Sequence, residues 1–400
     1  MTSKTENSKM ELATFIDSLM DEFSLLSDEK VAAEAIQDFG SIENALGGID
    51  AEIENAIASL GKDRLSKARA ALEESQKNAT RLSDPTQAYQ QLADFITSED
   101  GFRRLTLAAR NGRASSDDDA TSAIFDLCEL REFKQSSPQP KFGERAKADF
   151  ILQELGITKP EEIDIEVIAW HLGAKVRYGR LTQCEARIIG SDDVAMITVD
   201  EGAPPQRQRF SIGHELGHWI YHRGQTLCCQ AGDIELPSDQ SNNLERVADR
   251  FASELLMPSY LFVPIAQSLG PPSMRVVQQL AEIFKTSRTA TAIRLVQLNQ
   301  RPLCLVSHTK SGRRWFARSR TLSGNWMPSH ELRAETAAFG MIFGKSAPKA
   351  SPRCMNASIW FTRRDASRFN VIEDSFRVQN SEVISLLSVK EEKEFLCQET

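Results

Sequence analysis

The sequence predicts an α+β fold in three consecutive parts followed by a short tail, and three observations support this prediction. Apolar residues recur at helical spacing through residues 8–134, so this part is expected to be all-helical. After a Ser- and Pro-rich linker at residues 136–140, short strand-like stretches alternate with helices. From residue 302 the pattern is mixed again, which favours a second, small α+β domain. The expected parts are an acidic all-helical extension with its linker (1–140), a central domain (141–300), a basic domain (301–390) and an acidic tail (391–400).

Composition places the chain among ordinary globular proteins. Of its 400 residues, 41% are hydrophobic and 26% are charged. No apolar run approaches the roughly 20 residues that a membrane span needs, and the polar N-terminus lacks the apolar core of a signal peptide. The seven cysteines form no C-x-x-C pair, which argues against a disulfide framework. We therefore expect a cytoplasmic protein with no membrane contact.

The charge is distributed unevenly along the chain. Residues 1–150 carry 18 Lys and Arg against 28 Asp and Glu, a balance of −10. Residues 301–390 carry 15 against 6, a balance of +9. The two ends are therefore expected to meet different partners, or each other.

The first half of the central domain is predicted to combine helices and short strands. A helix over 146–155 is closed by Gly156, and a helix over 163–172 begins at the cap Asp164 and is closed by Gly173. The strand over 194–199 runs directly into a long helix that begins at Pro204-Pro205, and we expect it to be a sheet edge to which an extended peptide can add. The strands are expected at 175–178, 186–189 and 194–199.

The second half of the central domain is predicted to be helical. An amphipathic helix over 242–257 is stopped by Pro258. Two helices over 273–298 then flank a turn at 286–288, a spacing that resembles a helix-turn-helix. We expect this pair to serve packing, with direct DNA reading as the alternative. In the last domain, strands are expected at 303–306, 314–317 and 358–361, and a helix at 332–341.

The motif that carries chemistry is His214-Glu215-Leu216-Gly217-His218, an H-E-x-x-H run. On a helix, the spacing of four puts both imidazoles on one face, where one metal ion can bind them. Glu215 then points beside the metal, where a base for an activated water belongs. Gly213 and Gly217 would let another backbone approach this helix.

The next helix offers the remaining groups of a metal centre. Glu245 can complete a His-His-carboxylate ligand set, which is typical of catalytic zinc with its fourth position open. Asp249 is the best candidate to accept the second ring N–H of a ligand histidine. His222 is expected to be a bystander rather than a fourth ligand. Tyr221 and Tyr260 are both candidates for polarising a carbonyl group, and no spacing distinguishes them.

Two long blocks, 207–218 and 245–258, resemble the signature of the ImmA/IrrE family of zinc metallopeptidases. The helix over 163–173 and the strand that ends at Val199 resemble its peptidase domain, so the resemblance covers about residues 146–300. It implies a zincin-like domain with two active-site helices and a small sheet. It also implies a gluzincin-like site, with His214, His218 and Glu245 as ligands of Zn²⁺ (or of Mn²⁺ as a substitute) and Glu215 as the base.

The resemblance also implies a substrate and a control domain. Relatives cleave helix-turn-helix repressors and thereby derepress stress, DNA-damage, defence or mobile-element genes. Some carry a sensor-like domain after the peptidase, and residues 301–390 would be its GAF-like counterpart. The family often has Asn where this chain has Asp249, and aspartate suits a gluzincin. The extension over 1–140 lies outside the resemblance.

Two further hypotheses remain open. The chain could be a nucleic-acid-responsive sensor with a structural metal site, because the last domain interleaves basic and aromatic residues as single-strand binders do. That domain is accordingly expected to bind single-stranded DNA or a small-molecule activator. Separately, a free thiol of Cys184, Cys228 or Cys229 could occupy the open zinc position in a latent state. The basic and aromatic residues are Arg313, Arg314, Trp315, Arg318, Arg320, Arg363, Arg364 and Arg368.

Overall fold

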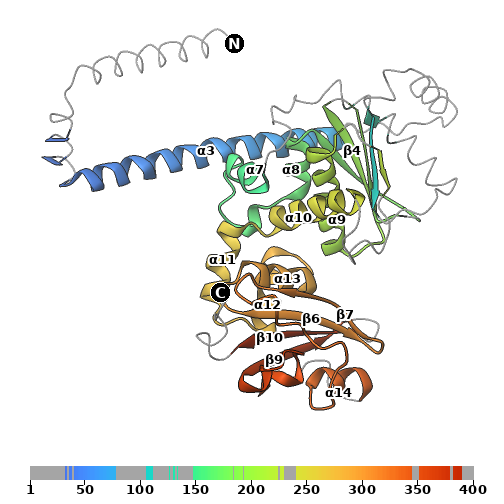
Figure 1. The fold of residues 1–400 in the computed structure, drawn as a ribbon. Helices are drawn as coiled ribbons and strands as arrows, with labels where there is room; N and C mark the ends of the chain where they lie inside the picture. Colours follow the sequence, from blue (N-terminus) through green and yellow to red (C-terminus); the bar gives the residue numbers. More distant parts are fainter. Residues whose placement is uncertain are drawn as a thin grey trace, which may run out of the picture. The chain divides into compact units, whose positions relative to one another are not determined.

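The computed structural model shows a mixed α+β protein with two five-stranded sheets (Figure 1). The chain divides into two compact units, residues 1–60 and 61–400, and both sheets belong to the second unit. No helix among the described residues is both long and apolar enough to cross a membrane. The structure describes residues 32–33, 36–37, 40–77, 105–110, 126, 129–130, 133, 147–182, 184–191, 193–223, 226–228, 240–344, 351–378 and 382–389.

The first sheet has the strand order β2-β4-β3-β1-β5 and is mixed in direction. β2 runs parallel to β4, and β1 runs parallel to β5, whereas the β3–β4 and β1–β3 pairs are antiparallel. The three strands predicted between residues 175 and 199 are confirmed. The strands are β1 (Leu105–Arg110), β2 (Ala174–Gly179), β3 (Ala186–Ser191), β4 (Val194–Asp200) and β5 (Thr226–Cys228).

β1 corrects the prediction that residues 8–134 are all-helical. Its register places Leu105 opposite Ser191 and Arg110 opposite Ala186, so the extension supplies an inner strand of the first sheet. Local periodicity cannot reveal this strand, because its partner lies about eighty residues later in the chain. The helix α3 (Ile42–Lys77) agrees with the helical prediction for that stretch. The predictions for residues 1–31, 111–119 and 391–400 lie outside the described residues.

β4 corrects the prediction that its strand is a sheet edge. It lies between β2 and β3, and both neighbours bond to it along its length. Residues 194–199 are all buried. A substrate peptide therefore has no free strand edge at β4. A continuous apolar run of this kind is typical of an inner strand, and the same run in the sequence could have indicated it.

The helices that the sequence predicts for the central part are present, with ends within a few residues of the prediction, whereas α11 and η1 were not predicted. The Asp164 carboxylate accepts the backbone N–H of Val167 at the start of α8. Gly156 and Gly173, with φ of 63° and 79°, follow α7 and α8 in left-handed conformation. The helices are α7 (Ala148–Glu154), η1 (Pro160–Glu162), α8 (Ile165–His171), α9 (Pro205–Tyr221), α10 (Gln240–Leu256), α11 (Ser259–Ser268), α12 (Met274–Phe284) and α13 (Arg288–Leu298).

The second sheet is antiparallel throughout and has the order β7-β6-β10-β9-β8. The stretch predicted as a strand at 358–361 instead begins as a 3-10 turn, because the Asn356 side chain accepts the N–H of Ser358 and caps it. The helix predicted at 332–341 is α14 (Ala337–Phe343), which begins later. The other elements are β6 (Leu303–Thr309), β7 (Gly312–Arg318), β8 (Arg353–Asn356), η2 (Ala357–Ile359), η3 (Ala366–Arg368), β9 (Asn370–Arg377) and β10 (Val383–Val389).

The helix pair α12–α13 joins the second sheet to the rest of the unit. Leu303 and Leu305 of β6 belong to the main apolar core together with Leu295 of α13, whereas Cys304 and Val306 face a second core under α14. At the start of α12, the backbone N–H of Met274 donates to Asp374 of β9 over 2.7 Å. Buried residues occupy much of both helices, so the pair acts as a packing layer.

Candidate metal centre

Helix α9 carries both histidines of the motif in the protein interior. Pro205 opens the helix, where its missing N–H costs nothing, and the helix packs against β1, β3 and β4. His214 and His218 are 2% and 0% exposed, and their ring centroids lie 4.7 Å apart. The predicted helix and its shared histidine face are therefore present.

Helix α10 approaches α9 closely because α9 has glycine at two positions. A Cβ on Gly217 would lie 2.8 Å from the Cα of Ala248, and one on Gly213 would lie 3.2 Å from the Cα of Ala252. Such distances allow no ordinary side chain at Gly217 unless the helices move apart. The close approach brings the carboxylate of Glu245 to the two imidazoles.

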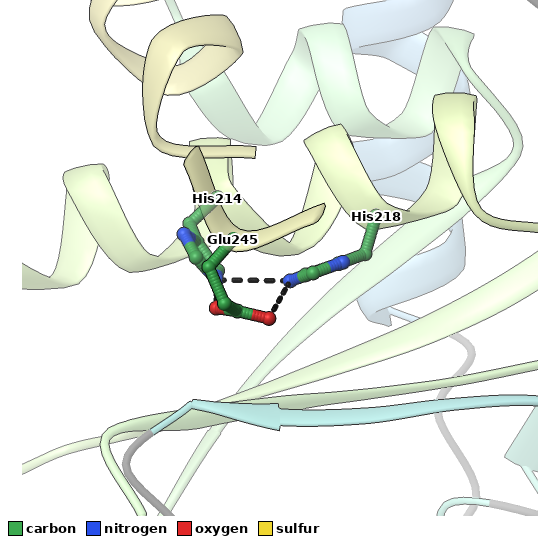
Figure 2. A group of neighbouring side chains, drawn as sticks. All are labelled: His214, His218 and Glu245. Carbon is green, nitrogen blue, oxygen red and sulfur yellow. Dashed lines mark hydrogen bonds and ion pairs between the residues drawn. The ribbon is translucent and has the colours of Figure 1, made fainter. Parts of the chain in front are cut away.

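Three side-chain groups converge at this helix crossing (Figure 2). The Nε2 atoms of His214 and His218 lie 3.0 Å apart. The two carboxylate oxygens of Glu245 lie 3.3 Å from Nε2 of His214 and 3.4 Å from Nε2 of His218. Among the described residues, these three alone form a cluster able to hold a metal ion.

The donor set fits a zinc ion in both spacing and chemistry. Ligand atoms about 2.0–2.2 Å from a tetrahedral Zn²⁺ lie about 3.3 Å from each other, close to the three distances observed. The Nδ1–H of His214 can donate to Asp249, 2.9 Å away, which leaves the lone pair of a neutral ring on Nε2. That lone pair then faces the Glu245 carboxylate, and a cation between them relieves the repulsion.

The outer ring nitrogens of the two histidines have different partners. Nδ1 of His214 faces the Asp249 carboxylate, as the sequence led us to expect. Nδ1 of His218 instead faces Nδ1 of His222 at 2.9 Å. Burial, with a contribution from His218, lowers the pKa of His222 to about 4. His222 does not belong to the metal cluster, but its ring contacts the proposed ligand His218. The spacing of four residues between positions 218 and 222 already indicated in the sequence that the two rings share a helix face.

Glu215 is fully buried on the same helix. It follows His214 directly, so it projects about 100° around the helix from that ring. This separates its carboxylate from the ligand face while keeping it within the same turn. Its role as a base remains a prediction.

The other candidate side chains have different surroundings. The ring of Tyr221 packs edge-on against Phe251 of α10, at 5.8 Å between centroids. The hydroxyl of Tyr260 donates to the carbonyl of Ile157 at 2.8 Å. Cys184 is half-buried and does not belong to the cluster. Cys229 and the side chain of Cys228 lie outside the described residues, so a thiol-blocked state stays a hypothesis.

The fold and the donor set are compatible with the zincin-like class of metallopeptidase domains. Residues 160–296 match the peptidase M78 family model, described as the IrrE N-terminal-like domain. The chain therefore resembles the ImmA/IrrE family over this segment, and the resemblance implies a bound metal.

Two individual proteins are also similar to this chain. The radiation response metalloprotease IrrE of Deinococcus radiodurans is 26% identical over 105 residues, which is 26% of this chain and 31% of that protein. The chain thus matches about a third of the length of this relative. A solved structure of a Mycobacterium tuberculosis transcriptional regulator has a TM-score of 0.40 and 15% identity, over 78% of this chain and 98% of the other.

Proposed function

We propose that this chain is a zinc-dependent endopeptidase. One observation carries the proposal: two buried histidines and a carboxylate from adjacent helices converge within 4.8 Å, with the buried Glu215 on the same helix. His214, His218 and Glu245 would hold the ion, and Asp249 would orient His214. A bound Zn²⁺ supplies a Lewis acid that polarises a carbonyl and lowers the pKa of water from 15.7 to about 7.

In this proposal Glu215 moves the proton of the reaction. Its carboxylate takes a proton from the attacking water while the water oxygen bonds to the carbonyl carbon of the scissile peptide. The C–N bond then breaks, and Glu215 gives the proton to the departing amine. Because Glu215 is fully buried, its carboxylate acts where bulk water is excluded and proton transfer is directed.

The proposed substrate is a helix-turn-helix transcriptional repressor. The resemblance to the ImmA/IrrE family supports this class of substrate. The Deinococcus relative is a radiation response metalloprotease, which supports a stress-related role for this chain. Cleavage would derepress stress, DNA-damage, defence or mobile-element genes in the cytoplasm. We also propose that residues 301–390 act as a GAF-like sensor.

The test is cleavage of a purified repressor whose gene neighbours the gene of this protein. The wild-type chain, loaded with Zn²⁺, should cut it at a defined bond that mass spectrometry can locate. The Glu215→Gln variant keeps the size and the ligands but loses the base, so its rate should fall by at least about 100-fold. Loading with Mn²⁺ tests the substitute ion.

Two results would contradict this proposal, the first its catalytic residue and the second its substrate. Equal cleavage by the wild type and Glu215→Gln would place the activity elsewhere, for instance in a contaminant. Failure of the Zn²⁺-loaded wild type to cut any neighbouring helix-turn-helix repressor, at high enzyme concentration and with single-stranded DNA added, would exclude the proposed substrate.

The second candidate is a nucleic-acid-responsive sensor with a structural metal site. Exposed arginines that form no ion pair with any described residue favour it: Arg318, Arg320, Arg364 and Arg368. In contrast, Arg314 pairs with Glu382 and Arg363 pairs with Asp365. Trp315 is half-buried and packs against the main core, so the aromatic part of the pattern serves packing.

Titration of single-stranded DNA at several salt concentrations tests this candidate. Binding through phosphates should weaken as salt rises, with a log–log slope of about −0.7 for each phosphate neutralised. The double variant Arg364→Gln, Arg368→Gln should make this slope less steep. Arg314→Gln should change the slope less, because Arg314 already pairs with Glu382. Binding that does not weaken with salt would contradict the candidate.

A further inference from the structure

The histidine one turn beyond the H-E-x-x-H motif is attached to the second proposed ligand at two points. His222 follows the last residue of α9, and its backbone N–H donates to the carbonyl of His218 over 2.9 Å. The side chain turns back, so that the two Nδ1 atoms also lie 2.9 Å apart. His222 is only 4% exposed, so water does not replace this contact.

His222 contacts the side of the His218 ring that faces away from the proposed metal position. Nε2 of His218 points toward His214 and Glu245 (Figure 2), whereas His222 meets the other nitrogen of the ring. The cluster of three metal-binding groups does not include His222. Its side chain therefore acts on the ligand rather than on the ion.

His214 shows what such a contact does. Its Nδ1 lies 2.9 Å from the Asp249 carboxylate, which can only accept a hydrogen bond, so the ring proton is on Nδ1 and Nε2 is free to ligate. His218 needs the same tautomer in order to ligate through Nε2. The acceptor at its Nδ1 is the second imidazole, His222, in place of a carboxylate.

We propose that His222 is a positioning residue, which holds His218 with its proton on Nδ1 and its lone pair on Nε2. The proposal rests on the metal centre of the proposed function. Nδ1 of His222 accepts the hydrogen bond, and the proton of His222 itself is on Nε2. The two ligand histidines are thus supported unequally, one by a carboxylate and the other by a neutral ring.

Three substitutions separate this hydrogen bond from simple packing. In His222→Asn, the amide oxygen occupies nearly the place of Nδ1 and can accept the same bond. In His222→Gln, the oxygen lies one carbon further along the side chain and is displaced from that place. His222→Leu fills similar space without any acceptor. Loss of a partner of this kind typically weakens metal binding 10–100-fold.

The measurement is the zinc dissociation constant of the full chain, from competition with a chelator of known affinity. We expect His222→Leu and His222→Gln to bind about 10–100-fold more weakly than wild type, and His222→Asn to bind within about threefold of it. The control is His308→Leu, which removes a buried histidine of the second sheet and should leave the constant unchanged. Thermal melting of each metal-free protein records its stability separately.

The outcomes distinguish this inference from the proposed function. If the wild type binds no zinc, the proposed metal centre itself is wrong. If the wild type binds zinc and His222→Leu binds it equally well, the positioning role is excluded. If His222→Asn binds zinc as weakly as His222→Gln does, His222 does not act through a hydrogen bond at its Nδ1. Should His222→Leu not fold, the two amide variants still decide the question.

Discussion

The two sheets support the metal centre in different ways. The first sheet packs directly against α9, which carries both histidines. The second sheet packs against α12 and α13. From α13, the Arg294 Nε donates to the carbonyl of Met257, just past the end of the Glu245-bearing helix α10. The first sheet is also assembled from distant segments, whereas all five strands of the second lie between residues 303 and 389.

This difference predicts which substitutions will disturb the metal centre most. A defect in the first sheet directly disturbs α9, the helix that holds two of the proposed ligands. A defect in the second sheet must be transmitted through α13 before it reaches α10. Substitutions in the first sheet should therefore cost more stability and affect metal binding more strongly.

The largest expected effect is that of Asp126→Ala. Asp126 is fully buried, and it accepts from Arg187 Nε at 2.9 Å and from Thr198 at 2.8 Å while pairing with Arg177. Its removal takes away the carboxylate that the buried Arg187, which is 6% exposed, contacts through two of its nitrogens. The free energy of unfolding should fall by about 3–5 kcal/mol in urea denaturation.

Asp365→Ala is the matched control, because it removes the acid of a half-exposed pair in the part that contains the second sheet. It should cost much less stability than Asp126→Ala, because water screens a pair at the surface. Equal losses for the two variants would contradict the greater sensitivity of the first sheet.

The second sheet has its own pH-dependent weakness at His308. Burial lowers the pKa of His308 to about 4, whereas an unfolded histidine titrates near 6.5. Between these values only the unfolded state binds the proton, so stability present above pH 6.5 is lost as the pH falls toward 4. The loss should approach about 3 kcal/mol.

Unfolding free energies of the wild type and of His308→Leu, measured from pH 7 to pH 4, isolate this contribution. The difference between the two proteins should shift steadily across this range in favour of the variant. A difference that does not change with pH would show that His308 titrates normally in the folded state.

A smaller effect is expected at the helix crossing. Gly217→Ala adds a Cβ 2.8 Å from the backbone of Ala248, so α10 must move and Glu245 with it. We expect a loss of about 1–3 kcal/mol together with weaker zinc binding. In Gly213→Ala, the added Cβ would lie 3.2 Å from the Cα of Ala252, which is a milder contact. The gain of about 1 kcal/mol in helix propensity should offset the cost of that contact. If the two variants bound zinc equally, the close approach would not position Glu245.

The smallest effect is expected for Arg294→Met. This variant removes the hydrogen bond to Met257 but also removes a buried charge, so it should cost about 1 kcal/mol. Zinc affinity should remain within about threefold of the wild type. A loss of zinc affinity as large as that of Gly217→Ala would instead mean that the second sheet controls α10 directly.

The sequence predicted what depends on local spacing. The histidine face of α9, the glycines facing α10, and the caps at Asp164, Gly156 and Gly173 all follow from neighbours a few residues apart. The approach of Glu245 and Asp249 to the histidines could also be expected, because two histidines alone are an incomplete set of zinc ligands and a ligand histidine usually donates its second N–H to a carboxylate.

Long-range pairing could not be predicted in this way. β1 became a strand only because β3 and β5 bond to it, and β4 became an inner strand only because β2 covers its other side. The contact of His222 with His218 was visible as a spacing, but its meaning depends on which ring nitrogen faces inward.

The central claim is that His214, His218 and Glu245 hold one metal ion, and zinc stoichiometry tests it most directly. After exhaustive dialysis against Zn²⁺ and then buffer, the wild type and Glu215→Gln should each retain one zinc per chain by elemental analysis. Glu245→Gln, which keeps the shape but removes a charged ligand, should retain almost none. Full retention by Glu245→Gln, or loss of zinc from Glu215→Gln alone, would contradict the account.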